Sequence, residues 1–257
     1  MRNLKLLIAY DGTAYAGWQR QAALPTVQGT IEAALSRQTK VPVTLYGAGR
    51  TDAGVHALGM TANFHTPSAI PCLGFTRGLN SLLPADIRIL AAAEVATSFN
   101  ARFDAIGKIY AYHCLTGPVP LPHQRLYHAQ VPGPLDLAAM AAALRLLEGE
   151  HDFASFEAAG SRTPDLEHGR GSVRRIISAG LAPTTEGGFV IRLHGDGFLR
   201  HMVRNIVGTV IEVGRGRRDL DDFNATLLAK NRSRAGATAP ACGLFLEEVR
   251  YARGDDL

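Results

Sequence analysis

The sequence predicts an α+β protein built from two α/β halves, residues 1–105 and 106–257. First, 46% of the residues are hydrophobic and 19% are charged, with no low-complexity tract, which is typical of a packed globular core. Second, apolar segments of the first half occur in the order β-α-β-β-α-β, which resembles a ferredoxin-like unit. Third, a new series of strands and helices begins after a junction near residues 99–106.

The elements of the first half follow from apolar periodicity and from capping residues. A glycine-rich loop that ends at Gly17 follows the first apolar strand. Thr26 can cap the first helix, and Pro84 ends the second. The predicted strands cover residues 4–10, 43–47, 60–66 and 88–96, and the predicted helices begin after Thr26 and at residue 73.

The second half is predicted in the same way. One helix, over residues 198–213, has an apolar face that we expect to pack on a sheet, with Arg200 and Arg204 at its border. That face comprises Leu199, Met202, Val203, Ile206 and Val210. The other predicted elements are strands near 108–115, 173–182, 189–195 and 244–251, helices over 135–148 and 219–229, and a proline-rich connection at 117–134.

Residues 47–57 read Gly-Ala-Gly-Arg-Thr-Asp-Ala-Gly-Val-His-Ala and contain the strongest candidate for a chemical role. Asp52 lies between small residues, two positions after Arg50, so we expect an ionised and accessible carboxylate that can serve as a nucleophile or base. A polar turn between two strands is the simpler interpretation. A dinucleotide-binding loop is excluded, because Asp52 replaces the third glycine of that motif and a strand follows instead of a helix.

Charge and cysteine content narrow the functional classes. Lysine and arginine number 27 against 23 acidic residues, and the arginines gather in two groups, which favours contact with phosphates. The three cysteines are widely spaced and the histidines lack metal-ligand spacing, so we expect no metal and a reducing, cytoplasmic location. The apolar run at 6–10 is too short for a signal peptide or a membrane span. The arginine groups are Arg200, Arg204, Arg215, Arg217 and Arg218, and Arg170, Arg174 and Arg175.

Motifs along nearly the whole chain resemble, in one order, those of the TruA family of tRNA pseudouridine synthases. The segment Gly-Arg-Thr-Asp-Ala-Gly-Val-His-Ala at 49–57 resembles the signature loop of that family, and Lys-Ile-Tyr-Ala-Tyr at 108–112 resembles its K-x-Y-x-Y strand. The other matching segments are 9–19, 27–32, 98–103, 151–156, 201–208 and 243–246. A series of this length is far more specific than one loop.

The resemblance implies a fold and a reaction. The fold joins two ferredoxin-like or RNP-like halves with antiparallel sheets, and the active site lies in the cleft between them. The reaction isomerises uridine to pseudouridine in the anticodon stem-loop of tRNA, at tRNA positions 38–40, on a nucleotide flipped out of its stack. It breaks the N1–C1′ bond, turns the base and rejoins it through C5, and it needs no cofactor. The family also implies a homodimer with tRNA lying across both subunits.

The resemblance assigns roles to five residues. Asp52 is the nucleophile, attacking either the sugar C1′ or the uracil C6, and Arg204 pairs with it. Arg50 helps to extrude the base or holds its phosphate. Tyr110 stacks on the target base, and its hydroxyl is a candidate acceptor of the C5 proton. Leu244 is a weaker candidate for the apolar wall beneath the base.

Two further segments bear on the interpretation. By strand alternation Lys108, Tyr110 and Tyr112 share one face, which is unusual for a core face and typical of a ligand-facing one. The stretch Ser161–Gly171 is longer and more charged than the family pattern leads us to expect, and we interpret it as a loop that faces RNA without assigning site residues to it.

Two other functional classes are weighed against the synthase. A non-catalytic tRNA-binding module on the same fold would not need Asp52, so finding Asp52, Arg204 and Tyr110 together counts against it. A small-molecule hydrolase that uses Asp52 would bring a metal-binding carboxylate close behind it, and residues 53–56 supply none.

Overall fold

The computed structural model describes residues 1–117, 119, 121–158 and 171–252. The chain divides into two compact units, Met1–Lys108 with Phe245–Leu257, and Ile109–Leu244. Most of the charged stretch predicted to face RNA, including Arg170, lies outside the described residues.

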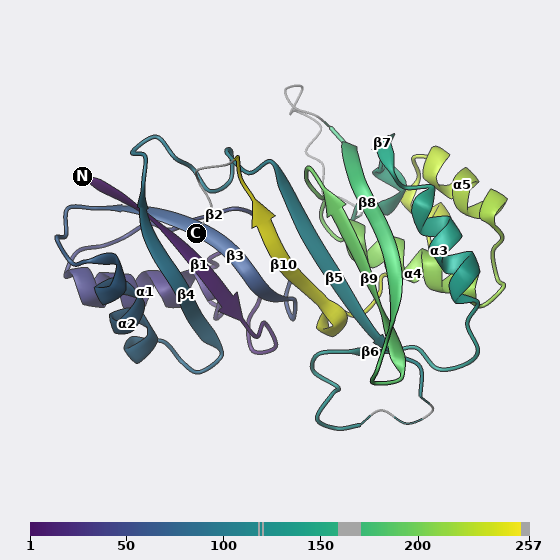
Figure 1. Ribbon diagram of the computed structural model, residues 1–257, viewed down its shortest axis with the longest axis horizontal. Coiled ribbons are helices and arrows are strands. Elements are labelled where there is room, and N and C mark those ends of the chain that lie inside the picture. The colour runs from purple at the N-terminus through teal and green to yellow at the C-terminus, as the bar shows by residue number, and fades with distance from the viewer. Residues whose placement is uncertain (118, 120, 159–170, 253–257) are drawn as a thin grey trace. The chain divides into compact units, whose positions relative to one another are not determined.

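The first unit is a sheet whose strands follow the order β4-β1-β3, with β1 antiparallel to both neighbours. Short β2 pairs antiparallel with β3, and β10 runs parallel to β3. The last strand was predicted to belong to the second half, whereas β10 pairs with β3 of the first unit. Helices α1 and α2 lie together on one side of the sheet (Figure 1). The elements are β1 (Arg2–Tyr10), α1 (Val27–Thr39), β2 (Tyr46–Gly47), β3 (His56–Thr66), α2 (Cys72–Leu82), β4 (Ile87–Val95) and β10 (Leu244–Arg250).

Local sequence explains these elements. Thr26 is the N-cap of α1, and its side chain accepts a hydrogen bond from the Gly29 N–H. Helix α2 ends at Leu82, two residues before Pro84, as predicted. The alternating apolar residues of β1 and the inner faces of the helices supply the core. Its fully buried members include Leu4, Leu6, Ile8, Ile31, Leu35, Phe64, Phe75 and Leu79.

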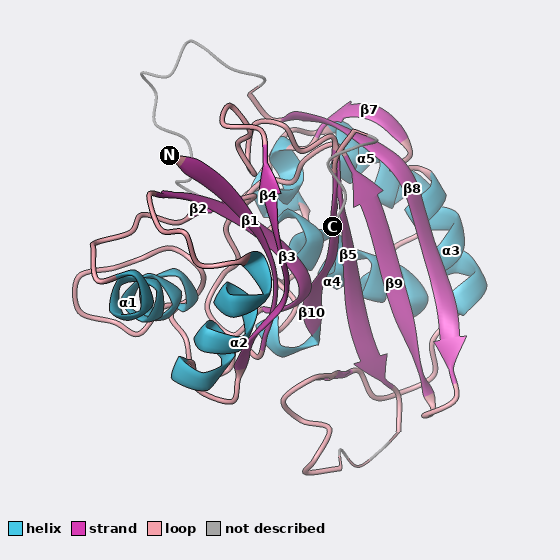
Figure 2. Cartoon of the chain, turned by 60° about the vertical axis from the view of Figure 1, so that its left-hand side comes forward, coloured by secondary structure: helices cyan, strands magenta, loops and turns pink. Residues whose placement is uncertain are grey.

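The second unit contains a sheet in the order β5-β9-β8-β7, and β6 pairs with β5. Strand β8 is antiparallel to both β7 and β9. Helices α3, α4 and α5 gather on one side of this sheet (Figures 1 and 2). Together the units confirm the predicted α+β class. The elements are β5 (Gly107–Leu115), β6 (Ala129–Gln130), α3 (Leu137–Arg145), β7 (Gly149–Asp152), β8 (Val173–Thr184), β9 (Gly188–Gly195), α4 (Met202–Gly214) and α5 (Leu220–Leu228).

Four strands differ from the prediction. Strand β2 covers only Tyr46–Gly47 of the predicted 43–47. Strand β3 begins at His56 and not near residue 60, so Gly59 lies inside the strand. Only glycine fits there, because the backbone of β10 passes very close to it. A Cβ at Gly59 would lie 2.3 Å from the carbonyl oxygen of Glu247 in β10. Strands β6 and β7 were not predicted, since each is short and β7 reads Gly-Glu-His-Asp without apolar alternation.

Helix α4 begins four residues later than predicted. His201 adopts a left-handed conformation with φ of 61°, so the helix starts at Met202. Leu199, which the prediction placed on the apolar face, therefore lies before the helix and is half-buried. The rest of that face is confirmed as buried, comprising Met202, Val203, Ile206 and Val210.

Within the described residues, no helix is long and apolar enough to cross a membrane. In the same part of the chain, no group of three or more His, Cys, Asp or Glu side chains is arranged to hold a metal ion.

Candidate active site

The loop that carries Asp52 is anchored on the residue before it. Thr51 is buried, and its hydroxyl forms a 2.8 Å hydrogen bond with the Tyr10 hydroxyl at the end of β1. The Thr51 carbonyl accepts a 3.1 Å hydrogen bond from the Trp18 N–H. Because both bonds are buried, displacing Thr51 would leave polar groups unsatisfied. The backbone that leads into Asp52 is thereby held in place.

Two glycines of the first loop allow the Asp52 loop to approach. Gly17 has φ of +95°, and a Cβ there would lie 2.5 Å from the Thr51 carbonyl oxygen and 3.1 Å from the carbonyl carbon of Asp52. A Cβ at Gly12 would lie 2.0 Å from the Val55 carbonyl oxygen. Only glycine fits at either position without moving the loop. The role of this glycine-rich loop could not be predicted from the sequence, because the loop that it contacts is distant along the chain.

Asp52 itself lies in a tight turn. Its carbonyl accepts a 3.2 Å hydrogen bond from the Val55 N–H, and Gly54 supplies the positive φ of 75°. The Asp52 side chain is half-buried between buried Thr51 and Val55, and Arg50 is exposed. A carboxylate on a fixed turn, still reached by solvent, has the preorganisation that a nucleophile requires.

Lys108 and Trp18 support the start of this loop. The Lys108 Nζ donates a 2.8 Å hydrogen bond to the Ala48 carbonyl oxygen and lies 3.0 Å from the position of a Cβ on Gly49. Gly47 packs directly on the Trp18 ring, where a Cβ would lie 2.6 Å from its atoms. The prediction assigned Lys108 to a ligand-facing strand face, and the structure gives it a contact with the loop.

The two tyrosines of β5 differ in their surroundings. The Tyr110 ring is 8% exposed and meets the Phe198 ring edge-on, with centroids 5.0 Å apart. Tyr112 is fully buried, and its hydroxyl donates a 2.8 Å hydrogen bond to the Pro240 carbonyl. Burial, together with the nearby Cys114 and Cys242, raises the pKa of Tyr112. The predicted ligand-facing role therefore does not hold for Tyr112, which is a core residue.

Two hydrogen bonds join Arg204 to Ala239, one through the Arg204 side chain and one through its main chain. Its Nε donates a 2.7 Å hydrogen bond to the Ala239 carbonyl, and its own carbonyl accepts a 3.1 Å hydrogen bond from the Ala239 N–H. The side chain is half-buried at the border of the apolar face, as predicted. These bonds fix the plane of the guanidinium, so less rotamer entropy is lost when it binds an anion.

The chain passes close to β5 at Gly243, immediately before Leu244. Leu244 is 5% exposed, and a Cβ on the preceding Gly243 would lie 2.8 Å from the His113 carbonyl and 2.9 Å from the Tyr112 ring. Gly243 therefore allows the chain to lie against the K-x-Y-x-Y strand immediately before Leu244.

The candidate residues fall in both units. Asp52 and Arg50 belong to the first unit, whereas Tyr110, Arg204 and Leu244 belong to the second. The structure links Arg204 to β5 through Ala239 and Pro240, since Pro240 accepts the Tyr112 hydrogen bond. The pairing of Asp52 with Arg204, which joins the two units, stays a prediction.

The arginines of the second unit differ in their exposure and in the hydrogen bonds that they make within the protein. Arg218 donates to Glu212, to the Thr226 hydroxyl and to the Arg234 carbonyl, so it has a structural role. Arg215 and Arg217 are exposed. Exposed guanidiniums are the better candidates for phosphate contacts, because Arg218 would have to give up internal partners.

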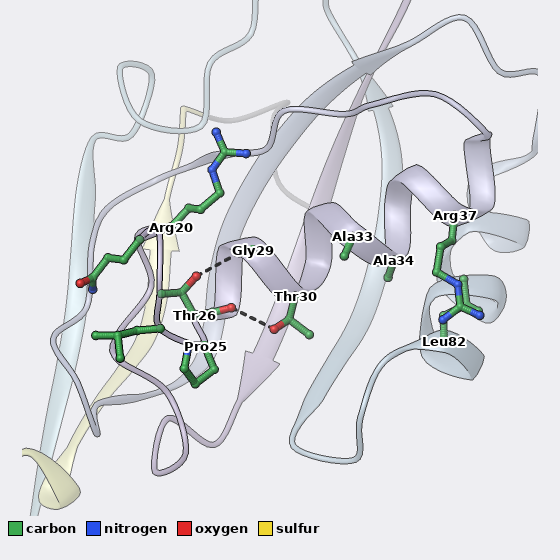
Figure 3. A pocket seen from close by; sticks show the side chains of 11 residues that line it. Arg20, Pro25, Thr26, Gly29, Thr30, Ala33, Ala34, Arg37 and Leu82 are labelled. Atoms are coloured by element: carbon green, nitrogen blue, oxygen red, sulfur yellow. Dashed lines mark hydrogen bonds between the residues drawn. The ribbon is translucent and has the colours of Figure 1, made fainter.

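A hollow of about 510 Å³ lies beside α1, with Arg20 and Arg37 among its lining residues (Figure 3). Its floor is formed by small side chains of α1. Asp52 and Arg50 are not among the described residues that line it, so the hollow is distinct from the candidate catalytic loop.

Comparison with known proteins identifies related chains. A family model described as tRNA pseudouridine synthase matches residues 6–104 and 143–252. A protein of Desulfotalea psychrophila called tRNA pseudouridine synthase A 1 is 50% identical over 251 residues, covering 98% of this chain and 100% of its own. Proteins called tRNA pseudouridine synthase A 2 in Clostridium tetani and tRNA pseudouridine synthase A in Solibacter usitatus are 44% and 46% identical, covering 97% and 98% of this chain and 99% and 100% of their own.

Proposed function

The chain belongs to the tRNA pseudouridine synthase family, as an isomerase that converts uridine to pseudouridine in tRNA, and from this premise we propose that it acts on the anticodon stem-loop with Asp52 as a covalent nucleophile. The observation that carries the proposal is the anchored turn around Asp52. Thr51 before it and Val55 at the end of the turn are buried and hydrogen-bonded, while the Asp52 side chain is half-buried. A uridine stacked in an RNA stem is beyond reach, so the nucleotide is flipped out before reaction.

In this proposal the Arg204 guanidinium orients and stabilises the ionised Asp52 carboxylate. Because Nε donates to Ala239, the pairing uses the two terminal nitrogens, in the end-on arrangement of a planar guanidinium. Arg50 is exposed and next but one to Asp52, which suits a contact with the phosphate of the target nucleotide or extrusion of its base.

Tyr110 and Leu244 are proposed to hold the base. Tyr110 offers an aromatic ring for stacking, and stacking tolerates rotation of the base in its own plane. When the C5–C1′ bond forms, the proton on C5 must leave and N1 gains a proton. The Tyr110 hydroxyl is the proposed acceptor of the C5 proton, and the nearly buried Leu244 is the proposed apolar wall.

The partners follow from the same premise. We propose a homodimer with tRNA lying across both subunits, acting in the cytoplasm without a cofactor. Redox-neutral isomerisation keeps every atom of the uridine apart from the exchanged protons, and this is the reason that no co-reactant is proposed.

The proposal is tested by mapping the product. Unmodified tRNA transcripts labelled with tritium at uracil C5 are incubated with the protein alone, and each release of tritium is matched to a pseudouridine located by sequencing. We expect release and a new pseudouridine in the anticodon stem-loop. Pseudouridine in another arm would contradict the proposed substrate site, and absence of release would contradict the proposed activity.

A further inference from the structure

The segment Gly236–Ala239, called the strap below, runs antiparallel along one face of α4. Its residues meet the helix in reverse order. The Gly236 N–H donates 2.9 Å to the Thr209 hydroxyl, and the Ala237 carbonyl passes over Gly208, where a Cβ would lie 1.8 Å away. Thr238 bonds to Asn205, and Ala239 bonds to Arg204. Each of the four residues of the strap therefore contacts α4, and the last of these contacts is with Arg204.

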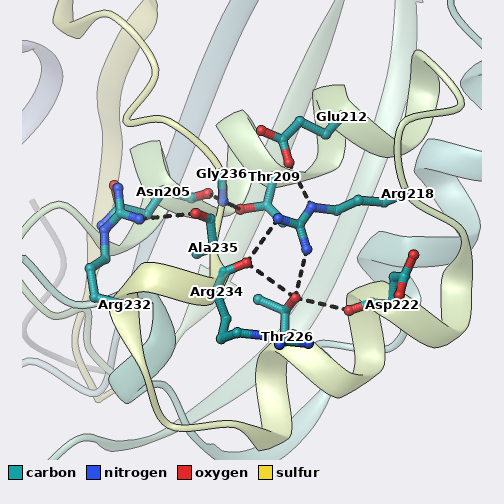
Figure 4. Close-up of polar contacts among 10 residues, drawn as sticks. All are labelled: Asn205, Thr209, Glu212, Arg218, Asp222, Thr226, Arg232, Arg234, Ala235 and Gly236. Carbon is teal, nitrogen blue, oxygen red and sulfur yellow. Dashed lines mark hydrogen bonds and ion pairs between the residues drawn. The ribbon is translucent and has the colours of Figure 1, made fainter.

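A polar cluster holds the strap just before Ala239. The Thr238 hydroxyl donates a 2.6 Å hydrogen bond to the Asn205 Oδ1, and the Arg232 Nη2 donates to both oxygen atoms at 3.1 Å. Asn205 is fully buried, and its Nδ2 donates 2.8 Å to the Phe156 carbonyl. Figure 4 shows Arg232 beside Asn205, with its bond to the Ala235 carbonyl and the bond of the Gly236 N–H to the Thr209 hydroxyl. Asn205 is buried and Thr238 and Arg232 are half-buried, and the three mutual hydrogen bonds make this cluster rigid.

We propose that Thr238, Asn205 and Arg232 are positioning residues that fix the Arg204 guanidinium for the reaction. The Ala239 carbonyl holds Arg204 Nε, and the cluster holds the residue next to Ala239. Pro240, the following residue, is fixed on its other side by the Tyr112 hydroxyl. The strap thus gives Arg204 a rigid main-chain acceptor, and a shift of the strap turns the guanidinium. This inference rests on the proposed role of Arg204 at Asp52.

The test substitutes Thr238→Val, which is nearly isosteric and removes the hydroxyl. We expect the single-turnover rate of tritium release at saturating protein to fall by about 10- to 100-fold, since a misplacement of about 1 Å costs up to about 100-fold. The affinity for tRNA should stay within about twofold. Thr238→Ser keeps the hydroxyl and should restore most of the rate. Arg232→Gln, at a half-buried side chain, gives a second variant of the same cluster with a loss in the same direction.

Thr226→Val is the matched control. It also removes a threonine hydroxyl that an arginine binds, here Arg218 at 2.9 Å, in a buried part of the same unit. We expect a similar loss of thermal stability with a rate within about twofold of the unsubstituted protein. If Thr238→Val and Thr226→Val are slowed equally, the cluster only stabilises the fold and the inference is overturned.

A double substitution separates this inference from the proposed function. In an Arg204→Lys background the guanidinium is absent, so adding Thr238→Val should slow the reaction by less than about threefold. A full further loss there would contradict action through Arg204. If Arg204→Lys is slow but Thr238→Val is fast, only the positioning role fails. If Arg204→Lys is as fast as the unsubstituted protein, both the role of Arg204 and this inference fail.

Discussion

Gly17→Ala tests whether the close approach of the first loop sets the position of Asp52. A Cβ at residue 17 would lie 2.5 Å from the Thr51 carbonyl oxygen, so the Asp52 loop must retreat by about 1 Å to reach an ordinary separation of about 3.5 Å. The positive φ of 95° adds a strain of about 1–2 kcal/mol in an alanine. A retreat of about 1 Å at a nucleophile should lower the single-turnover rate by about 100-fold.

Gly133→Ala supplies the control for backbone strain alone. Gly133 has φ of +103°, and no atom lies within 4 Å of the position of a Cβ there. It should lose about 1–2 kcal/mol of stability with its rate nearly unchanged.

The assay combines thermal denaturation, tRNA affinity and single-turnover release of C5 tritium. We expect both variants to be destabilised, to bind tRNA within about threefold of the unsubstituted protein, and to differ strongly in rate. Equal rates in Gly17→Ala and Gly133→Ala, with both proteins folded at the assay temperature, would refute the reasoning.

Three further predictions follow from the candidate residues. Arg204→Lys should slow the chemical step strongly with little change in tRNA affinity, because lysine keeps the charge and loses the planar fork; weakened binding with intact chemistry would instead make Arg204 a phosphate contact. If the Tyr110 phenol accepts the C5 proton, Tyr110→Phe should cleave the glycosidic bond and retain the C5 tritium. Normal tritium release by Tyr110→Phe would leave Tyr110 only its stacking role, worth about 1–3 kcal/mol. Tyr110→Leu should be slower still, and a Tyr110→Leu rate equal to that of the unsubstituted protein would remove Tyr110 from the site. Arg217→Ala should reduce the slope of log K for tRNA against log salt by about one unit, and an affinity that does not depend on salt would contradict phosphate contact.

Much of the fold could be predicted because its signals are local. The Thr26 cap, the stop at Pro84 and the alternation of β1 each lie within a few residues of the feature they specify. The start of β3 could not be predicted, because a glycine such as Gly59 normally indicates the end of a strand. Its place inside β3 is explained only by the close approach of the β10 backbone. Strand β7 pairs through its backbone, and its polar side chains carry no pattern.

The site shows the same division. The motif around Asp52 marks the loop, but its support comes from Gly17, Trp18 and Lys108, which are distant in sequence. Tyr112 lies on the same face of β5 as Tyr110 and was predicted to face a ligand with it. Its hydroxyl instead donates a hydrogen bond to the Pro240 carbonyl. Alternation assigns a face of a strand, and only packing decides which residues of that face are reached by a ligand.

The most direct test of the central claim is the single-turnover release of C5 tritium from tRNA by Asp52→Asn. The amide is isosteric and cannot attack, so we expect loss of release by many powers of ten, with the thermal stability and tRNA affinity nearly unchanged. Asp221→Asn, at an exposed carboxylate in the first turn of α5, should release tritium at the normal rate and serves as the control. An Asp52→Asn protein that keeps even about a tenth of the normal rate would contradict the assignment of Asp52 as the nucleophile.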